Sequence, residues 1–232
     1  MMLGPITIYE CPHCKANISS SSWPHPLLGL FPRRYSDGYN NAIRLGETGL
    51  TKCEGCQCFI WLNQCKQIDS IDRRNNYTIK DGVEIPNPQY QKWAHCFHAR
   101  NLSAIELREA IQEGIAKNAK EEINLRTRIL WYDNMPFRNL NWEGSSGSTR
   151  EEKMDNIEAL IKLMNKMEEK GLLFLAELYR ERGQFSISLT ILESIDSMEI
   201  QTQKHVDLWT QACNEKNDSV LELPRFFNCK LF

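Results

Sequence analysis

Apolar residues beyond residue 100 recur at intervals of three and four positions, which predicts a series of amphipathic helices. One apolar stripe runs through Ala104, Leu107, Ile111 and Ile115, and a second helix is expected over residues 120–132. The stripe of a third helix consists of Met154, Ile157, Leu160, Ile161, Met164 and Met167. We therefore expect this part of the chain to be all-α.

Two sequences of the capping-box type indicate where helices should begin. Ser103 precedes Glu106 by three positions, and Thr149 precedes Glu152 in the same way. In this arrangement the hydroxyl and the carboxylate each accept a hydrogen bond from a backbone N–H at the start of the helix.

Breaker residues divide the helical part further. Segment 133–148 contains a proline and a run rich in glycine and serine, which predicts a loop. Gly183 separates residues 171–182 from residues 184–195, which predicts two helices joined by a tight turn with a left-handed glycine. A last helix is expected near residues 199–214.

The first part of the chain has a different pattern. Short runs at 6–9 and 59–62 are candidate strands, and prolines and glycines interrupt the sequence between them. Residues 1–70 are predicted to form a small β-rich domain, residues 71–100 a polar connector, and residues 101–232 an α-helical domain. The expected fold class is α+β.

Charge and hydropathy narrow the classes of partner. Residues 1–100 carry 11 Lys and Arg against 8 Asp and Glu, and the remainder carries 17 against 22. A nucleic-acid footprint is usually more basic than this, so a nucleic-acid partner is not favoured. The longest apolar run, residues 172–176, is too short to cross a membrane, and the first ten residues lack the pattern of a secretory signal. We expect a cytoplasmic protein without a membrane partner.

The most specific chemical signal is a pair of Cys-x-x-Cys motifs, at residues 11–14 and 53–56. Nine cysteines without a secretory signal favour thiols and metal ligands over disulfides. Two such motifs supply four thiolates, the donor set of a closed structural Zn²⁺ site. The predicted ligands are Cys11, Cys14, Cys53 and Cys56. Cys58 and Cys65 lie nearby in sequence, but Cys58 would have to displace Cys56 to act as a ligand.

Several motifs in this region carry a resemblance to known proteins. They are Cys11-Pro-His-Cys14, Tyr35-Ser-Asp-Gly38, Thr51-Lys-Cys-Glu-Gly-Cys56 and Phe59-Ile-Trp61. Together they resemble the N-terminal zinc-ribbon segment of a group of uncharacterised bacterial proteins in which helical repeats follow the ribbon. The resemblance implies a zinc-ribbon fold and a metal, and it implies no reaction. Lys15 and Gln57 depart from the pattern, because zinc knuckles often have glycine at these positions.

A second resemblance lies in the helical part. Residues 175–188 resemble the middle of a tetratricopeptide repeat, with Tyr179, Gly183 and Phe185 at matching offsets and Ser188 in place of the usual alanine. Only one copy is recognisable, whereas about three are needed for an independent solenoid. The segment then forms either a concave peptide-binding groove or an αα-hairpin packed in a bundle. We favour the second interpretation.

The remaining candidate residues are weaker. Trp131, Tyr132 and Trp142 flank the predicted loop and are predicted partner contacts, although packing in a core explains them as well. Cys96 follows His95, a pair that can serve as nucleophile and base, but no third group that would orient them is recognisable.

The sequence therefore predicts a noncatalytic protein with one structural Zn²⁺ whose task is to bind another protein. No phosphate-binding loop, nucleophile elbow or metalloprotease motif is present in the sequence. Two alternatives remain open. One is a nucleic-acid-binding regulator that uses the zinc ribbon, and the other is an enzyme that uses Cys96 with His95.

Overall fold

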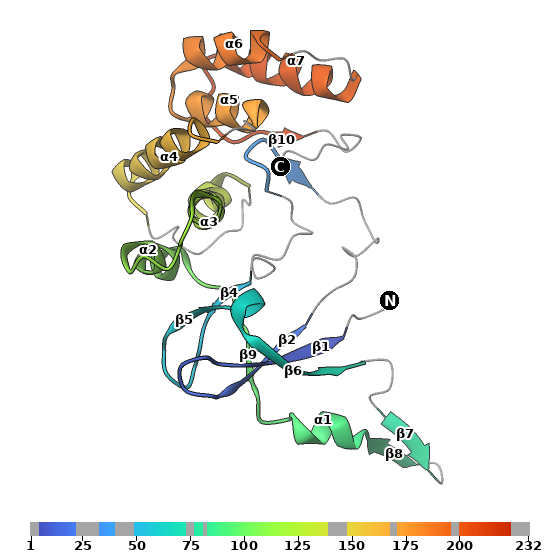
Figure 1. Cartoon of the computed structure of the whole chain (residues 1–232). Helices are drawn as coiled ribbons and strands as arrows, with labels where there is room; N and C mark the ends of the chain where they lie inside the picture. Colours follow the sequence, from blue (N-terminus) through green and yellow to red (C-terminus); the bar gives the residue numbers. More distant parts are fainter. Residues whose placement is uncertain are drawn as a thin grey trace. The chain divides into compact units, whose positions relative to one another are not determined.

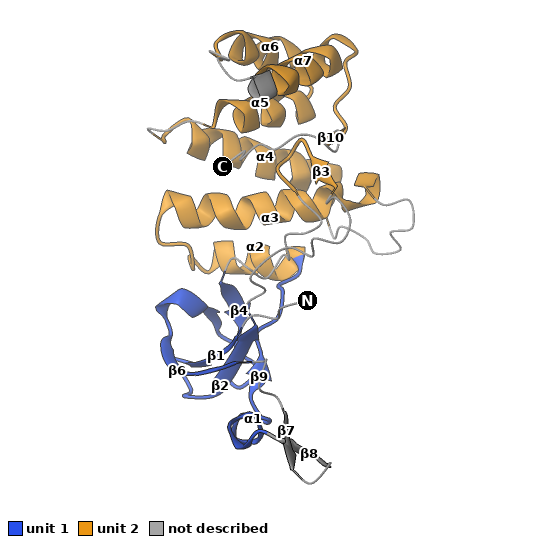
Figure 2. Cartoon of the chain, turned by 90° about the vertical axis from the view of Figure 1, so that its right-hand side faces the viewer, with its two compact units in different colours: residues 1–30, 43–103 blue, residues 31–42, 104–232 orange. Residues whose placement is uncertain are grey.

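The computed structural model describes residues 5–21, 33–39, 49–72, 77–80, 83–138, 148–167, 171–195 and 200–223. A strand region that contains the cysteines is followed by helices, so the fold combines α and β structure as expected (Figure 1). The chain divides into two compact units (Figure 2). Unit 1 consists of residues 1–30 and 43–103, and unit 2 consists of residues 31–42 and 104–232.

A four-stranded sheet forms the centre of unit 1, in the order β6-β1-β2-β9. These strands are β1 (Ile6–Glu10), β2 (Asn17–Ser21), β6 (Lys66–Ile71) and β9 (Phe97–His98). Strand β1 pairs antiparallel with both β2 and β6, whereas β9 pairs parallel with β2. The sheet thereby brings together segments from both ends of unit 1.

Alternation along β1 places its apolar residues on one face. Ile6 and Ile8 are buried and join Ile71 in a small core. Trp93 packs against this core, and its indole N–H donates a hydrogen bond of 2.7 Å to Asp69.

Residues 71–100, predicted as a polar connector, contain regular structure. They form the hairpin of β7 (Tyr77–Lys80) and β8 (Val83–Pro86), the short helix α1 (Pro88–Lys92) and strand β9. Tyr90 and Trp93 of this segment pack against the core around Ile8, and α1 and β9 belong to unit 1.

A second hairpin in unit 1 carries the other cysteine pair. It consists of β4 (Leu50–Lys52) and β5 (Phe59–Trp61), followed by the short 3-10 helix η1 (Leu62–Gln64). All three residues of β5 are buried. A small apolar cluster formed by Ile18 and Ile60, with Leu62, therefore lies beside the cysteines.

Helices make up most of unit 2. They are α2 (Ala104–Gln112), α3 (Ala119–Arg138), α4 (Arg150–Met164), α5 (Leu172–Glu181), α6 (Phe185–Glu193) and α7 (Ile200–Asn214). Each helix packs on the next one along the chain, and α5 also contacts α7 (Figure 2). Among the described residues, no helix combines the length and the apolar character that crossing a membrane requires.

Two predicted helix boundaries are confirmed. Thr149 caps α4 by accepting a hydrogen bond from the N–H of Glu152, and the Glu152 carboxylate accepts one from the N–H of Thr149. Gly183 ends α5 with a φ of 76°, in the left-handed region. The apolar stripe of α4 packs on α3 and α5 around buried Leu130 and Phe174.

The predicted end of the second helix is wrong. Helix α3 does not stop at Tyr132 but continues through Pro136 to Arg138. A proline in a helix removes a backbone hydrogen bond. Here Arg138 supports the last turn by donating from Nη1 to the carbonyl of Trp131, at 2.9 Å. The next part of the predicted loop, residues 139–147 with Trp142, lies outside the described residues.

One segment between the two cysteine pairs belongs to unit 2. Strand β3 (Arg34–Tyr35) pairs antiparallel with β10 (Glu222–Leu223), near the other end of the chain. Tyr35, Ser36 and Asp37 are buried within unit 2. The sequence pattern had assigned this segment to the β-rich domain.

Candidate metal centre

Each cysteine pair lies in the turn of a β-hairpin. The first turn is closed by the pairing of Glu10 with Asn17, and the second by the pairing of Lys52 with Phe59. The two loops that carry the cysteines therefore have the same number of residues between their flanking strands. The two hairpins form equivalent knuckles.

The backbone of the two knuckles is also equivalent. The N–H of Lys15 donates to the carbonyl of Cys11 at 3.1 Å, and the N–H of Gln57 donates to that of Cys53 at 2.7 Å. Lys15 and Gln57 have φ values of 64° and 60°, in the region where glycine is least strained. This geometry explains why zinc knuckles often have glycine at these positions.

The structure brings all four predicted ligands together. Their Sγ atoms lie within 4.8 Å of one another. The separation is 3.8 Å between Cys11 and Cys56, and 3.6 Å between Cys14 and Cys53. A tetrahedral zinc site with Zn–S bonds of about 2.3 Å places its sulfurs about 3.8 Å apart. The four thiols therefore have the spacing of a tetrahedral thiolate site, and each is a free cysteine.

Gly55 allows the second knuckle to approach the first. A Cβ atom at this position would lie 3.2 Å from the Sγ of Cys14 and 3.2 Å from the Cβ of Ala16. Any larger residue would therefore press on one ligand and on the first hairpin. The glycine within the second Cys-x-x-Cys motif has a steric role.

Burial and backbone donors set the charge preference of the thiols. Burial raises the pKa of Cys53, because a thiolate there loses solvation. Burial also raises the pKa of Cys11, but hydrogen bonds from the backbone N–H groups of Cys14 and His13 and from the thiols of Cys53 and Cys14 together bring the value to about 7. The backbone N–H groups of Cys56 and Gly55 act on the pKa of Cys53 in the same direction, so both knuckles supply backbone donors that stabilise a thiolate.

The two neighbouring cysteines lie outside the cluster. The thiol of Cys58 donates to the carbonyl of Cys56 at 3.6 Å, and the thiol of Cys65 donates to the carbonyl of Trp61 at 3.3 Å. Both are half-buried. The arrangement leaves Cys56, rather than Cys58, beside the other three sulfurs.

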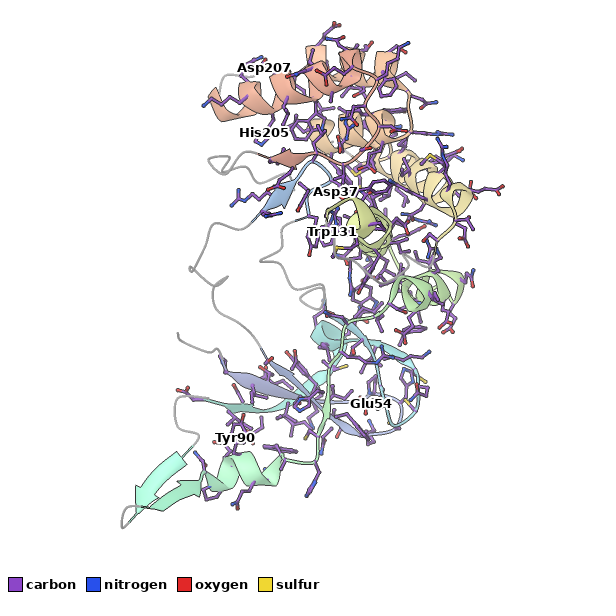
Figure 3. All side chains as sticks on the ribbon, turned by 180° about the vertical axis from the view of Figure 1, so that it is seen from behind. Asp37, Glu54, Tyr90, Trp131, His205 and Asp207 are labelled. Carbon is purple, nitrogen blue, oxygen red and sulfur yellow. The ribbon has the colours of Figure 1, made fainter. Side chains whose placement is uncertain are left out.

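The predicted partner contacts are placed as follows. Trp131 is only 8% exposed, and its indole N–H donates to the carbonyl of Asp37 at 3.0 Å (Figure 3). Tyr132 is half-buried, and burial raises its pKa. Trp142 lies outside the described residues. Their role in binding a partner stays a prediction.

Of the predicted pair His95 and Cys96, the cysteine has the features of a packed thiol. Cys96 is half-buried against the core around Ile8, and burial raises its pKa. A raised pKa reduces the thiolate fraction that a nucleophile needs at neutral pH. His95 is exposed.

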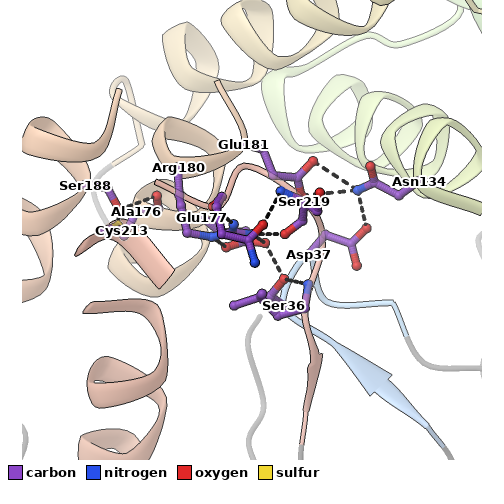
Figure 4. Close-up of polar contacts among 12 residues, drawn as sticks. Ser36, Asp37, Asn134, Ala176, Glu177, Arg180, Glu181, Ser188, Cys213 and Ser219 are labelled. Carbon is purple, nitrogen blue, oxygen red and sulfur yellow. Dashed lines mark hydrogen bonds and ion pairs between the residues drawn. The ribbon is translucent and has the colours of Figure 1, made fainter. Parts of the chain in front are cut away.

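Sequence reasoning missed a buried polar network in unit 2 (Figure 4). Asp37 is fully buried and accepts hydrogen bonds from Asn134 Nδ2, at 2.8 Å, and from Arg138 Nη2. The guanidinium of Arg138 also lies over the rings of Tyr35 and Tyr39, at 5.0 and 4.2 Å from their centroids. Helix α3 thus holds the segment that comes from between the knuckles.

Helix α5 holds the same segment on its other side. The hydroxyl of Ser36 donates to the buried carboxylate of Glu177, and it accepts from the N–H of Leu221 at 2.9 Å. Arg180 pairs with Glu177 through two hydrogen bonds of 2.8 and 2.7 Å, and it also donates to the carbonyl of Ser219. Strong polar contacts therefore join three segments that are distant in sequence.

A weak signal for this network exists in the sequence. Asn134 and Arg138 lie four positions apart on α3, and Glu177, Arg180 and Glu181 lie on one side of α5. Such spacing is also typical of a solvent-exposed helix face, so it does not by itself indicate burial.

Comparisons with protein-family models, with curated proteins and with solved structures found no match to this chain. The chemistry of the site therefore follows from its own geometry. Four thiols from two equivalent hairpins can surround one metal ion completely. A site of this type stabilises a fold and leaves no coordination position for a substrate.

Proposed function

We propose that the protein binds one structural Zn²⁺ in unit 1 and binds another protein through unit 2. The observation that carries the metal proposal is the convergence of four Sγ atoms within 4.8 Å. All-sulfur tetrahedral sites favour zinc among the common divalent metals. Free thiols throughout the described residues suit a reducing compartment such as the cytoplasm, where we place the protein.

The metal would act as the main stabiliser of the two knuckles. The apolar cluster beside the cysteines is small, and its buried members other than cysteine are Ile18, Ile60 and Leu62. Small domains of this kind gain a large part of their folding free energy from the metal. The role we assign to zinc is therefore structural, and the protein is proposed to be noncatalytic.

Unit 2 is proposed to be a tetratricopeptide-like stack. Each helix packs on its neighbour along the chain, and α5 contacts both α6 and α7, as in solenoids whose repeats contact only their neighbours. Ser188 fits this packing although the repeat usually has alanine there. Its hydroxyl donates to the carbonyl of Ala176 at 2.8 Å, so the additional polar group is satisfied.

The way unit 2 holds its own segment 33–39 supports a protein-binding role. Strand β3 of this segment pairs with β10, and the tight turn that follows inserts Ser36 and Asp37 between α3 and α5. Backbone pairing combined with buried side chains is also a way in which proteins recognise peptides. Helices that hold a segment of their own chain in this manner offer a framework for binding a second chain.

The test is recovery of a partner with the full-length protein, followed by reconstitution of the complex from purified components. We expect a complex of fixed stoichiometry in size-exclusion chromatography. Ile187, which is 42% exposed on α6, is the variant position, and Ile68 on β6 of unit 1 is the matched control. Ile187→Asp should weaken the complex, whereas Ile68→Asp should leave it unchanged.

Two results would contradict the proposal. One is the absence of a protein complex together with binding to nucleic acid that weakens steeply with salt, which would support the nucleic-acid alternative. The other is a zinc content far below one ion per chain in protein purified without chelators.

A further inference from the structure

Unit 2 contains a cavity of about 450 Å³ that the proposed function does not use. It lies where α3 ends, α4 begins and α5 ends, and its lining includes Asp133, Phe137, Lys153, Met154 and Glu181. This volume is in the range of pockets that bind small organic ligands. The chemistry of the lining indicates which class of ligand would fit.

Asp133 has an unused acceptor. Its side chain is 2% exposed, and its Oδ1 accepts from the hydroxyl of Ser148 and lies 3.5 Å from Nη2 of Arg108. Its Oδ2 is buried and has no hydrogen-bond partner among the described residues. Buried carboxylate oxygens nearly always accept hydrogen bonds, so we expect a ligand to supply a hydrogen-bond donor to this atom. Burial raises the pKa of Asp133, a shift that a cation beside Oδ2 would oppose.

The ammonium of Lys153 is engaged elsewhere. It lies 3.1 Å from the carboxylate of Glu181 and donates to Oδ1 of Asn134 at 2.6 Å. Asn134 Nδ2 in turn donates to both oxygens of Glu181, at 3.1 Å each. The second buried carboxylate of the lining is thus satisfied within the protein, and Asp133 is not.

Apolar surface adjoins the two carboxylates. Phe137 is 63% exposed, which is unusual for a phenyl ring, and it lines the cavity together with Pro136 and Met154. The ammonium of Lys153 lies 5.6 Å from the centroid of this ring, so the ring already contacts one cation of the lining. An aromatic face beside an unsatisfied carboxylate is the arrangement that binds organic cations, because the ring attracts positive charge while it contacts the apolar part.

Acidic groups outnumber basic groups in the lining of the same cavity. Asp133, Glu181 and Asp218 supply three carboxylates, whereas Arg150 and Lys153 supply two cations. Two N–H groups at the start of α4, those of Thr149 and Glu152, are occupied by their reciprocal capping, which leaves fewer donors for an anion. The charge of the lining therefore favours a cation over an anion.

We infer that this cavity binds an organic cation, a primary ammonium or guanidinium group on an apolar body. The cationic N–H donates to Oδ2 of Asp133, and the apolar body packs on the ring of Phe137. The cation belongs either to a free amine or to a lysine or arginine side chain of another protein. The inference goes beyond the proposed function, since it assigns a cavity and a ligand chemistry that neither the zinc site nor the proposed protein complex requires.

Calorimetric titration of the full-length, zinc-loaded protein tests the inference. The free-cation probes are n-butylamine and n-butylguanidine, and the peptide probe is acetyl-Gly-Lys-Gly-amide. The controls are butyrate and acetyl-Gly-norleucine-Gly-amide, which lack the cation. We expect the cations to bind at least about tenfold more tightly than their controls. Binding of the free amines alone indicates a small-molecule site, and tighter binding of the peptide indicates a protein side chain.

Two variants and one control locate the binding. Phe137→Ala removes an exposed ring, so folding should be unaffected while cation affinity falls roughly three- to tenfold. Ile105→Ala on α2, at a residue 57% exposed and outside the cavity lining, should leave the affinity unchanged. Asp133→Asn should abolish the preference for the lysine peptide over the neutral norleucine peptide.

The outcomes separate cleanly. If Asp133→Asn does not fold by circular dichroism, Phe137→Ala and Ile105→Ala still decide the question. Cations that bind no better than butyrate and the norleucine peptide overturn the inference, as does an affinity that Phe137→Ala leaves unchanged. Complex formation with a protein partner is measured separately, so either proposal can fail without the other.

Discussion

Asp37 Oδ2 accepts a hydrogen bond of 2.8 Å from Nδ2 of Asn134, although 97 positions of sequence separate the two residues. Both are fully buried. Asp37 comes from the segment that the two cysteine knuckles enclose, and Asn134 comes from α3. Residues 33–39, which come from between the knuckles, are therefore an internal part of the helical unit.

Replacement of Asp37 by alanine should destabilise unit 2 strongly. The change leaves the buried guanidinium of Arg138 without its carboxylate and removes one of the acceptors of Asn134 Nδ2, which keeps the oxygens of Glu181. Removing one member of a buried ion pair costs about 3–5 kcal/mol. The free energy of unfolding in urea, followed by the helical circular dichroism signal, measures the effect. Asp155→Ala, at an exposed position on α4, is the control and should change it by less than about 0.5 kcal/mol. Equal values for the two variants would show that the buried pair contributes nothing.

A fragment of residues 104–232 should be unstable alone and should recover when a peptide of residues 31–42 is added. The fragment lacks the Asp37 carboxylate, to which Asn134 and Arg138 donate, and the Ser36 hydroxyl, which donates to Glu177. Each buried polar group left without a partner costs about 1–3 kcal/mol. Helical content as a function of peptide concentration provides the measurement. The same peptide with Asp37→Ala is the matched control, and recovery with both peptides, or with neither, would argue against a specific anchor.

Removal of the metal should unfold the knuckles and spare most of the helices. Zinc binding supplies roughly 10 kcal/mol or more to small domains of this type, whereas the helices have apolar cores of their own. Cys53→Ser should therefore reduce zinc content and raise hydrogen exchange in β1, β2, β4 and β5. Cys58→Ser is the control, because its thiol lies outside the cluster. Loss of zinc in Cys58→Ser, with zinc retained in Cys53→Ser, would reverse our assignment of the ligands.

Replacement of Gly183 by alanine should cost about 1 kcal/mol through the backbone alone. Its φ is 76°, and a Cβ atom there would meet no other atom within 4 Å. The left-handed conformation disfavours residues with a side chain, and no steric clash adds to this effect. Urea unfolding of the variant measures the cost. Gly183→Asn should cost less, because asparagine tolerates this conformation better, and a larger cost for asparagine would contradict the backbone explanation.

Features with a local cause could be predicted from the sequence. The ligand spacing of Cys11/Cys14 and Cys53/Cys56, the capping box at Thr149 and the left-handed turn at Gly183 each depend on a few adjacent residues. Their geometry in the structure agrees with these expectations. The local sequence is sufficient to predict such features, because the interacting groups are neighbours in sequence or belong to two copies of one motif.

Features with a distant cause could not be predicted. Nothing near Ser36 or Asp37 indicates that their partners lie on α3 and α5. The continuation of α3 through Pro136 depends on Arg138, which Asp37 holds in place. A Tyr-Ser-Asp-Gly motif is also typical of a surface turn, so its burial follows only from the tertiary structure.

The pairing of Ser36 with Leu221, 185 positions later, has a consequence for synthesis on the ribosome. At translation rates of 5–20 residues per second, Ser36 emerges roughly 10 to 40 s before Leu221 is made. All four cysteines are made before or early in this interval, so the metal can be captured while the helices are still incomplete. Until the last part of the chain appears, Ser36 lacks its partner Leu221, and a nascent chain at this stage is the form most open to proteases and chaperones.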